Sequence, residues 1–372
     1  MSYKILLLSD INSIHTQKWA IALAQHHIQI GIFSLSAPQT NWWKEHSNIQ
    51  LLFHTPIQSP HSITQKLKYL WYLPHLKKSI QTFNPHILHA HYASSYGLLG
   101  ALSGFHPFVL SVWGSDVFDF PQKNRMTKKI LQHNLQKADI ICSTSHVMAD
   151  ETKKYTSKPI EVVPFGVDTD LFKPIYPKKI FTNNELVIGT VKTLSPKYGI
   201  DLLIKAFKII VDTHQHLPLK LLIVGDGAQK TKLMNLAESL HIAHQVLFYG
   251  KVENHHVPEL LAEMDIFVVL SREESFGVAL VEAMACEKPV VASRVSGFKE
   301  VLLHKQTGIL VEKENIEAAT RALSELIQNP ALRTSMGKAA REYVLKKYRF
   351  ADHVLQMIHL YKKLVKTPVG SQ

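Results

Sequence analysis

Two glutamates, Glu274 and Glu282, could act on a polar ligand because they flank a glycine turn. The apolar run 266–270 before the turn predicts a buried strand, and the residues from Val278 onward predict a helix. Backbone N–H groups at a helix N-terminus bind anions, and Gly277 would let a ligand approach closely. The turn is therefore a candidate phosphate site, with carboxylates placed for the hydroxyl groups of the same ligand.

The spacing of the two glutamates is a weak signal by itself. Eight positions on a continuous helix would put Glu274 and Glu282 on roughly the same face, but that spacing alone favours a solvated stripe. A second turn, Gly225-Asp226-Gly227, follows an expected strand. Lys230 stands where a nicotinamide-binding fingerprint has its third glycine, so a capped strand-to-helix connection fits this turn at least as well.

Short apolar strands alternate with amphipathic helices in both halves of the chain. The first half predicts strands at residues 4–9, 28–35, 87–90, 108–112, 139–143 and 160–163, and helices near 16–25, 62–82, 92–103, 123–137 and 145–154. The second half predicts strands at 186–191, 219–224, 246–249, 266–270 and 289–292, helices near 200–213, 228–240, 255–263 and 277–286, and then only helices near 315–327, 330–347 and 351–366. Apolar strands alternating with helices are typical of parallel sheets covered on both faces.

The fold class predicted from this alternation is α/β, with two Rossmann-like parallel-sheet domains facing across a cleft. We expect a first domain over residues 1–172, a proline-containing linker over about 173–185, a second domain over 186–350, and a C-terminal segment, 351–372.

Length and composition agree with two folded domains. The 372 residues are 46% hydrophobic and 19% charged. The net charge of +12 is spread along the chain, which favours a surface for anionic small molecules or an anionic membrane over a nucleic-acid tail. The two cysteines form no CxxC pair, so we expect reduced thiols and no zinc site. We expect a cytoplasmic protein, because the first apolar run is too short for a signal peptide and the uncharged stretch 85–115 is too interrupted to span a membrane.

Several sequence blocks resemble glycosyltransferase family 4, also called glycosyl transferases group 1. The family signature, an E-x-F-G turn that leads into E-A-M-A and P-V-V-A, is matched by Glu274, Phe276-Gly277, Glu282-Ala283-Met284-Ala285 and Pro289-Val290-Val291-Ala292. Other matching blocks cover nearly the whole chain: ILHAH (87–91), LSVWGSD (110–116), VVPFGVD (162–168), VKTLSPKYGIDLLIKAF (191–207), LLIVGDG (221–227) and VLFYGKV (246–252). The resemblance implies the GT-B fold, with helix 351–366 returning to the first domain, and a retaining enzyme that uses a nucleotide-diphosphate sugar.

The resemblance also implies roles for residues of the second domain. Lys192 and Lys197 match the basic pair that neutralises the departing diphosphate, although lysine at 192 lacks the bidentate fork of the usual arginine. Glu274 would contact hydroxyls of the donor sugar, and Glu282 those of the ribose. The other donor-binding residues implied are Ser275, Phe276, Gly277 and Val278 at the distal phosphate, Gly225, and Val252 and Asn254 at the nucleobase.

The first domain departs from the family pattern in two places. Residues 10–15 replace a glycine-rich loop, and Trp113 replaces a histidine that faces the sugar in many members. The polar candidates that remain for catalysis are Asp116 and His91, and a structural role in the core fits His91 at least as well. Trp113 fits packing, or stacking on a sugar, better than a chemical role.

The implied mechanism is front-face displacement, with no cofactor, no metal and the lysines in place of a metal ion. Alternatives of the same architecture are a sugar-nucleotide epimerase or hydrolase and a phosphorylase. Alternatives of another class are a non-catalytic nucleotide-sugar binder and a nucleic-acid binder, the latter disfavoured by the absence of a basic strip interleaved with aromatic residues.

The expected acceptor is a hydroxyl group of a lipid-linked or cell-envelope glycan. Membrane association is a separate hypothesis. It rests on basic residues around apolar ones: Lys66, Lys68, Lys77 and Lys78 around Leu67, Leu70, Trp71 and Leu73, and the group Lys123, Arg125, Lys128 and Lys129. A core-packed helix with a solvated charged rim fits the first group equally well.

Overall fold

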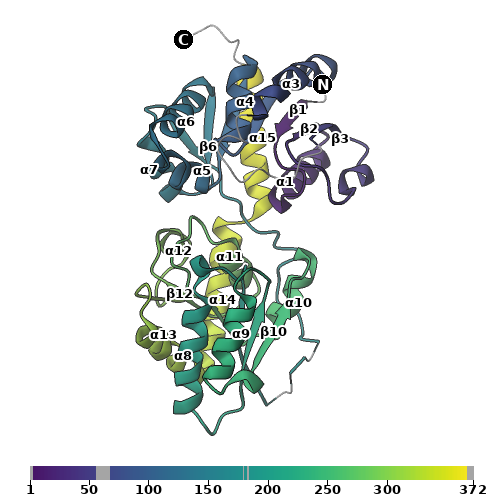
Figure 1. Ribbon diagram of the computed structural model, residues 1–372. Helices are drawn as coiled ribbons and strands as arrows, with labels where there is room; N and C mark the ends of the chain where they lie inside the picture. The colour runs from purple at the N-terminus through teal and green to yellow at the C-terminus, as the bar shows by residue number, and fades with distance from the viewer. Residues whose placement is uncertain (1–2, 56–67, 179, 182–183, 367–372) are drawn as a thin grey trace. The chain divides into compact units, whose positions relative to one another are not determined.

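The structure is a computed structural model that describes residues 3–55, 68–178, 180–181 and 184–366 (Figure 1). It divides into two compact units. The first comprises residues 1–165 and 351–372, and the second comprises residues 166–350. Each unit is built on a parallel sheet with helices around it, which confirms the α/β class and the two Rossmann-like domains.

The first unit contains a seven-stranded sheet in the order β3-β2-β1-β4-β5-β6-β7, with every pair parallel. Its strands are β1 (Lys4–Leu8), β2 (Gln29–Ser34), β3 (Ile49–His54), β4 (Ile87–His91), β5 (Phe108–Val112), β6 (Ile140–Ser143) and β7 (Ile160–Val162). Residues 5–8 of β1 are fully buried because β1 is a central strand covered on both faces. The strand order reverses between β1 and β4, where ligand sites form in such sheets.

The helices of the first unit follow the strands along the chain. They are α1 (Ile14–Gln25), α3 (Leu73–Phe83), α4 (Ser95–Ser103), α5 (Ser115–Phe118), α6 (Arg125–Lys137), α7 (His146–Lys153) and α15 (Phe350–Lys366), with 3-10 turns η1 (Trp42–Glu45), η2 (Lys68–Tyr72) and η3 (Phe120–Gln122). Helix α15, yellow in Figure 1, belongs to this unit although it ends the chain. The hydroxyl of its Tyr361 lies 2.6 Å from Nδ1 of His89 on β4, and Gln356 donates to the Val162 carbonyl.

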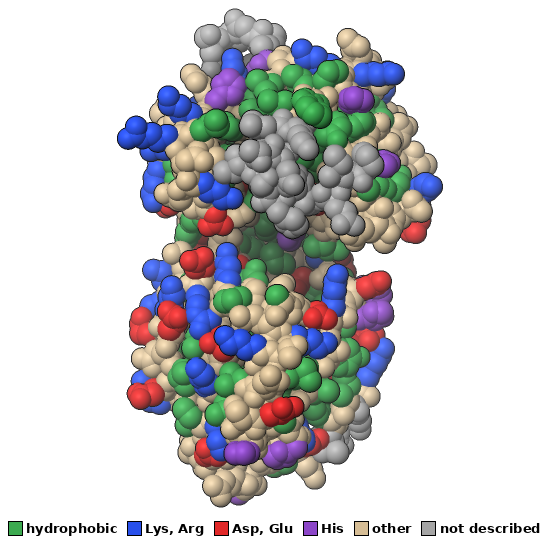
Figure 2. All heavy atoms as spheres, viewed as in Figure 1, with side chains coloured by type: hydrophobic (Ala, Val, Ile, Leu, Met, Phe, Trp, Pro, Cys, Tyr) green, Lys and Arg blue, Asp and Glu red, His purple; other side chains and the backbone are tan. Residues whose placement is uncertain are grey.

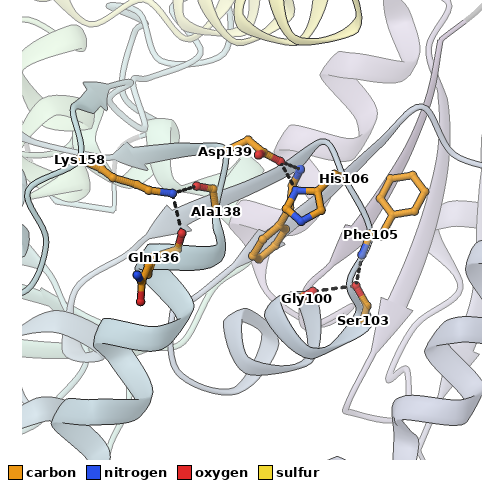
Figure 3. A network of polar contacts seen from close by, with 9 residues as sticks. Gly100, Ser103, Phe105, His106, Gln136, Ala138, Asp139 and Lys158 are labelled. Atoms are coloured by element: carbon orange, nitrogen blue, oxygen red, sulfur yellow. Dashed lines mark hydrogen bonds and ion pairs between the residues drawn. The ribbon is translucent and has the colours of Figure 1, made fainter. Parts of the chain in front are cut away.

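A polar network lies at the amino ends of β5 and β6 (Figure 3). Asp139 accepts a hydrogen bond from the backbone N–H of Phe108 (2.6 Å) and lies 2.7 Å from Nδ1 of His106. Lys158 donates to the carbonyl of Ala138 just after α6 (2.6 Å), which satisfies a helix-end acceptor. These contacts lie at the amino ends of the strands, whereas His91 and Asp116 lie at or after carboxyl ends, so the contacts belong to the scaffold.

The second unit contains a six-stranded parallel sheet in the order β10-β9-β8-β11-β12-β13, and its strand order reverses between β8 and β11. The strands are β8 (Leu186–Val191), β9 (Leu219–Val224), β10 (Val246–Gly250), β11 (Ile266–Val269), β12 (Val290–Ser293) and β13 (Ile309–Val311). The helices are α8 (Ile200–Thr213), α9 (Lys230–Ser239), α10 (Val257–Ala262), α11 (Val278–Ala285), α12 (Ser296–Val301), α13 (Ile316–Gln328) and α14 (Pro330–Lys347), with turns η4 (Pro196–Tyr198), η5 (Ala243–Gln245) and η6 (Asn254–His256).

Two strands and one boundary differ from the sequence predictions. Strand β3 was not predicted, and β13 lies where only helices were expected; both are edge strands, and β13 has only three residues. The division falls after Phe165 rather than after residue 172. Val167 donates its backbone N–H to Tyr348 and accepts one from Phe350, and Phe172 is fully buried, so the start of the expected linker is packed into the second unit.

Charge on the second unit is mixed rather than gathered. Figure 2 shows basic and acidic side chains interspersed over the face in view, which agrees with an evenly spread charge excess. Among the described residues, no helix is long and apolar enough to cross a membrane.

Candidate active site

The carboxyl ends of the second sheet gather most of the predicted site residues. Lys192 follows β8, Gly225 follows β9, and Glu274 lies in the loop after β11. Strands β8 and β11 are the neighbours at which the order reverses, and their carboxyl ends are the expected place for a ligand. The fold therefore brings together residues that are far apart in sequence.

Lys192 and Glu274 form an ion pair. The Lys192 Nζ lies 2.6 Å from Glu274 Oε2, and the two side chains are only 10% and 13% exposed. The ammonium also lies over the rings of Tyr198 (4.7 Å to the centroid) and Phe298 (5.9 Å). Burial, and secondarily the Glu274 carboxylate, raises the pKa of Tyr198. The pair is thus a shielded cation and anion, with two aromatic rings near the cation.

The turn that leads into α11 is fixed by close packing. Gly277 has a φ of +98°, and a Cβ there would come within 2.6 Å of the Phe298 ring. Gly297 donates its backbone N–H to the Glu274 carbonyl (3.0 Å), and a Cβ on Gly297 would come within 2.6 Å of the Phe276 nitrogen. Because Gly277 has no side chain with which to cap the helix, the N-terminus of α11 suits an external anion.

Glu274 does not lie on a helix, which corrects the argument from helical spacing. Helix α11 begins at Val278, so Glu274 belongs to the preceding loop while Glu282 lies on the helix. Glu282 is 4% exposed, and its Oε1 accepts a hydrogen bond from Asn254 Nδ2 (3.2 Å). Glu282, the candidate for ribose binding, and Asn254, the candidate for nucleobase binding, therefore contact each other.

The remaining residues predicted to bind the donor differ in burial and in backbone conformation. Ser275 and Val278 are half-buried, Phe276 is buried, and Val252 is half-buried in the loop after β10. Gly225 has a φ of +136°, and a Cβ there would come within 1.9 Å of the Lys192 carbonyl oxygen. Gly225 thus permits the close approach of its loop to the backbone at Lys192.

Lys197 is the more accessible of the two predicted lysines. It lies in η4, its side chain is 46% exposed, and its Nζ is 3.9 Å from Glu273 Oε2. In this structure Lys197 is the exposed cation, whereas Lys192 is already bound to a carboxylate.

In the first unit, Asp116 fixes a turn. Its carboxylate is fully buried and accepts hydrogen bonds from the backbone N–H groups of Ala93 (2.6 Å), Trp113 (3.1 Å) and Gly114 (2.7 Å). Burial raises the pKa of Asp116, and these hydrogen bonds oppose that shift. These contacts favour a structural role over the expected catalytic one.

His91 is part of an aromatic cluster at the carboxyl ends of β4 and β5. Its ring stacks on Trp113 at 4.5 Å, and its Nδ1 lies 3.1 Å from the Ser9 hydroxyl. Trp113 also meets His15 and Phe165 edge-on. Burial, with smaller contributions from His89 and His15, holds the pKa of His91 well below its usual value. His91 is therefore neutral and supports the half-buried indole.

Three residues at the site, Tyr198, Phe298 and Gly297, were missed from the sequence. Tyr198 adjoins Lys197 in sequence and could have been noticed there. Gly297 and Phe298 follow the next strand of the sheet, and only the order of the strands brings them to the Glu274 turn.

Comparison with known proteins identifies the family. The family model for glycosyl transferases group 1 matches residues 172–343, and the model for glycosyl transferase 4-like proteins matches residues 4–145. The chain is 29% identical over 335 residues to the N-acetyl-alpha-D-glucosaminyl L-malate synthase of Bacillus anthracis, covering 84% of each chain.

Solved structures show the same fold. Sucrose-phosphate synthase from Thermosynechococcus elongatus superposes with a TM-score of 0.85 at 21% identity, covering 97% of this chain and 99% of that one. Anabaena HepE in complex with UDP-glucose gives a TM-score of 0.79 at 19% identity, covering 97% and 100%. The chain belongs to the group 1 glycosyltransferases of family 4 and is a transferase enzyme with the GT-B fold.

Proposed function

We propose that this enzyme moves a sugar, with retention of anomeric configuration, from a nucleotide-diphosphate sugar to a hydroxyl acceptor. The observation that carries the proposal is the Lys192–Glu274 pair beside the N-terminus of α11, with the exposed Lys197 of η4 lying 3.9 Å from the neighbouring Glu273. The neighbour Anabaena HepE, which is described with bound UDP-glucose, supports a donor of this chemical class.

In the proposed donor complex, each group contacts the part of the donor that its chemistry fits. The backbone from Ser275 to Val278 binds the distal phosphate, because N–H groups at a helix start favour an anion. Glu274 accepts hydrogen bonds from sugar hydroxyls, and Glu282 accepts them from the ribose. A carboxylate-to-hydroxyl hydrogen bond contributes about 1.5–3 kcal/mol.

The proposed chemical step is front-face displacement. The bond from the anomeric carbon to the phosphate oxygen breaks while the acceptor oxygen bonds to the same face of that carbon. The acceptor proton passes to the leaving phosphate oxygen, so the products are the glycoside and the nucleoside diphosphate. Lys192 and Lys197 would stabilise the negative charge that develops on the diphosphate.

The Lys192–Glu274 contact fits a role in substrate exchange. A donor phosphate that reaches Lys192 competes with Glu274 for the ammonium, and Glu274 then becomes available to the sugar hydroxyls. Binding would thus exchange one charge pair for two polar contacts to the ligand, so that neither buried charge is left without a partner.

We propose that no metal ion is required, because the two lysines supply positive charge where the diphosphate would lie. The test is sugar transfer in excess chelator. Undiminished transfer is expected, and transfer that stops with chelator and returns with added divalent metal would overturn this part of the proposal.

We propose a lipid-linked or cell-envelope glycan as acceptor, approached from an anionic membrane face. Trp71 is 74% exposed, and Lys77 and Lys78 are exposed on the following helix. Met126 is 54% exposed within the second basic group. Lys66 and Leu67 of the first group lie outside the described residues, as does the side chain of Lys68.

Vesicle co-sedimentation tests the membrane proposal. Binding to anionic but not neutral vesicles at low salt, weakened by Trp71→Ala with Lys77→Gln and Lys78→Gln, is expected. Equal behaviour of wild type and variant would overturn it. A small acceptor must also be tested in the sugar-transfer assay described next. L-malate serves for this, because it appears in the name of the Bacillus anthracis relative.

A transfer assay with a panel of nucleotide-diphosphate sugars tests the function. We expect acceptor-dependent release of nucleoside diphosphate with one donor. Turnover of a donor without any acceptor would instead favour a hydrolase or epimerase. Donor binding with no turnover across lipid, glycan and hydroxy-acid acceptors would favour a non-catalytic binder.

A further inference from the structure

The short turn η4 carries Lys197, one of the two lysines of the candidate site. Lys197 lies within it, and the neighbouring Tyr198 places its ring 4.7 Å from the Lys192 ammonium. None of the three residues of this turn is buried. Packing of apolar side chains therefore contributes little to holding the turn, and polar contacts must fix it.

Arg272 makes those polar contacts. Its backbone N–H donates to the Lys197 carbonyl (2.7 Å), and its Nη1 donates to the Pro196 carbonyl (2.5 Å). The same residue thus binds two consecutive carbonyls of the turn, one from its main chain and one from its side chain.

The Arg272 side chain is itself fixed by two carboxylates. Nη1 and Nη2 donate to the two oxygens of Asp201 at the start of α8 (3.0 and 2.8 Å), and Nε donates to Glu314 (2.8 Å). The hydrogen bonds that the guanidinium donates to Asp201 raise the pKa of Arg272 further above its ordinary value, so the guanidinium stays charged. A planar fork is the geometry that such a bidentate contact requires.

The region beside the turn is open. A cavity of about 490 Å³ is lined by Pro196, Asp201 and Arg272 together with residues of α8 and α9. The turn borders open space there, and the contact of the Arg272 guanidinium with the Pro196 carbonyl holds it on that side.

We propose that Arg272 is a positioning residue that holds Lys197 at the diphosphate site through η4. Arg272 has no assigned part in binding the donor or in the chemistry; it acts through the turn. The assignment of Lys197 to the diphosphate rests on the proposed function, whereas the control of η4 by Arg272 does not.

Hydrogen exchange tests the control of the turn without any substrate. In full-length Arg272→Gln, the amides of residues 193–195 and 197–199 should exchange roughly tenfold faster or more, because the turn opens without the Arg272 contacts. Arg294→Gln is the matched control: Arg294 follows the neighbouring strand β12, is 37% exposed and pairs with Glu312 (2.8 Å). Equal exchange of residues 193–195 and 197–199 in both variants would overturn the proposal, whether or not the enzyme is active.

A double-mutant cycle tests the action through Lys197. Arg272→Gln should lower kcat about tenfold or more with a smaller change in the KM for the donor, since a misplaced cation loses transition-state contact. Arg272→Lys should restore little, because lysine lacks the fork. In a Lys197→Ala background, Arg272→Gln should have almost no further effect on kcat.

The outcomes separate the two hypotheses. Full additivity of Arg272→Gln and Lys197→Ala would overturn the action through Lys197. If wild type transfers no sugar from any donor, the proposed function fails, and the exchange measurement alone decides whether Arg272 controls η4.

Discussion

The ammonium of Lys192 lies 2.6 Å from the carboxylate of Glu274, although the two residues are 82 positions apart in the chain. They follow adjacent parallel strands, β8 and β11, at the point where the strand order reverses. The ion pair lies in a shielded place, since the two side chains are only 10% and 13% exposed. The proposed function places Lys192 at the diphosphate and Glu274 at the sugar, so donor binding would replace their direct contact.

Glu274→Ala and Lys197→Ala should each lower turnover by about a hundredfold or more, because each removes a contact that strengthens as charge develops on the donor. Steady-state transfer rates give the measurement. Glu317→Ala, at an 85% exposed position of the same unit, and Lys338→Ala, on α14, are the controls and should stay within about twofold. Near-normal rates in the first two variants would contradict the proposed roles of Glu274 at the donor sugar and Lys197 at the diphosphate.

Lys192→Met should destabilise the second unit by roughly 1–3 kcal/mol, because Glu274 is left as a largely buried carboxylate without its cation. Adding Glu274→Gln should recover part of that loss, since no unpaired charge then remains. Hydrogen exchange of β8 and β11 measures the change within this unit. A double variant less stable than Lys192→Met would contradict the interpretation of the pair.

The first unit should lose stability as the pH falls below about 6.5. Burial lowers the pKa of His89 to about 3 and that of His91 well below its usual value, so both are neutral when folded. The unfolded chain takes up these protons near pH 6.5, so acid favours unfolding by roughly 1.4 kcal/mol per pH unit for each histidine.

Urea unfolding followed by tryptophan fluorescence measures this loss. All five tryptophans (Trp19, Trp42, Trp43, Trp71 and Trp113) belong to the first unit, so the signal reports that unit. A free energy of unfolding that does not change between pH 7.5 and pH 5 would show that the two histidines are not neutral in the folded protein.

Gly297→Ala should weaken nucleoside-diphosphate binding by roughly tenfold or more, because the new Cβ displaces the turn that begins α11. Gly104→Ala is the control. Gly104 has a φ of +70° with nothing within 4 Å of an added Cβ, so that variant bears backbone strain only and should bind normally. Calorimetric titration compares the two, and equal affinities would contradict the packing argument.

The sequence was sufficient for the fold where strands are apolar throughout. Strand β8 and helix α8 have the predicted bounds, since a continuous buried strand and an amphipathic helix each leave a clear periodicity. Strand β3 was missed because it is an edge strand in which only Ile49 is buried, so its apolar pattern is short. Strand β13, with three residues, leaves too short a pattern for any periodicity.

The site could be predicted only in part. Glu274, Glu282 and Lys197 carry motif signals, and their residue types limit the chemistry. Two features depend on which strands are neighbours in the sheet: the contact of Lys192 with Glu274, and the close packing of Gly297 against the turn. The order of residues along the chain does not reveal which strands are neighbours. The argument from helical spacing does not hold for the two glutamates, because Glu274 lies in the loop before the helix.

The central claim is that the second unit binds the diphosphate of a nucleotide-sugar donor through Lys197 and the N-terminus of α11. Calorimetric titration of wild type, Lys197→Ala and Lys338→Ala with a panel of nucleoside diphosphates tests it most directly. We predict that one nucleoside diphosphate binds wild type and Lys338→Ala equally, and binds Lys197→Ala roughly tenfold or more weakly. Binding of none of them, or equal binding to all three proteins, would contradict the claim.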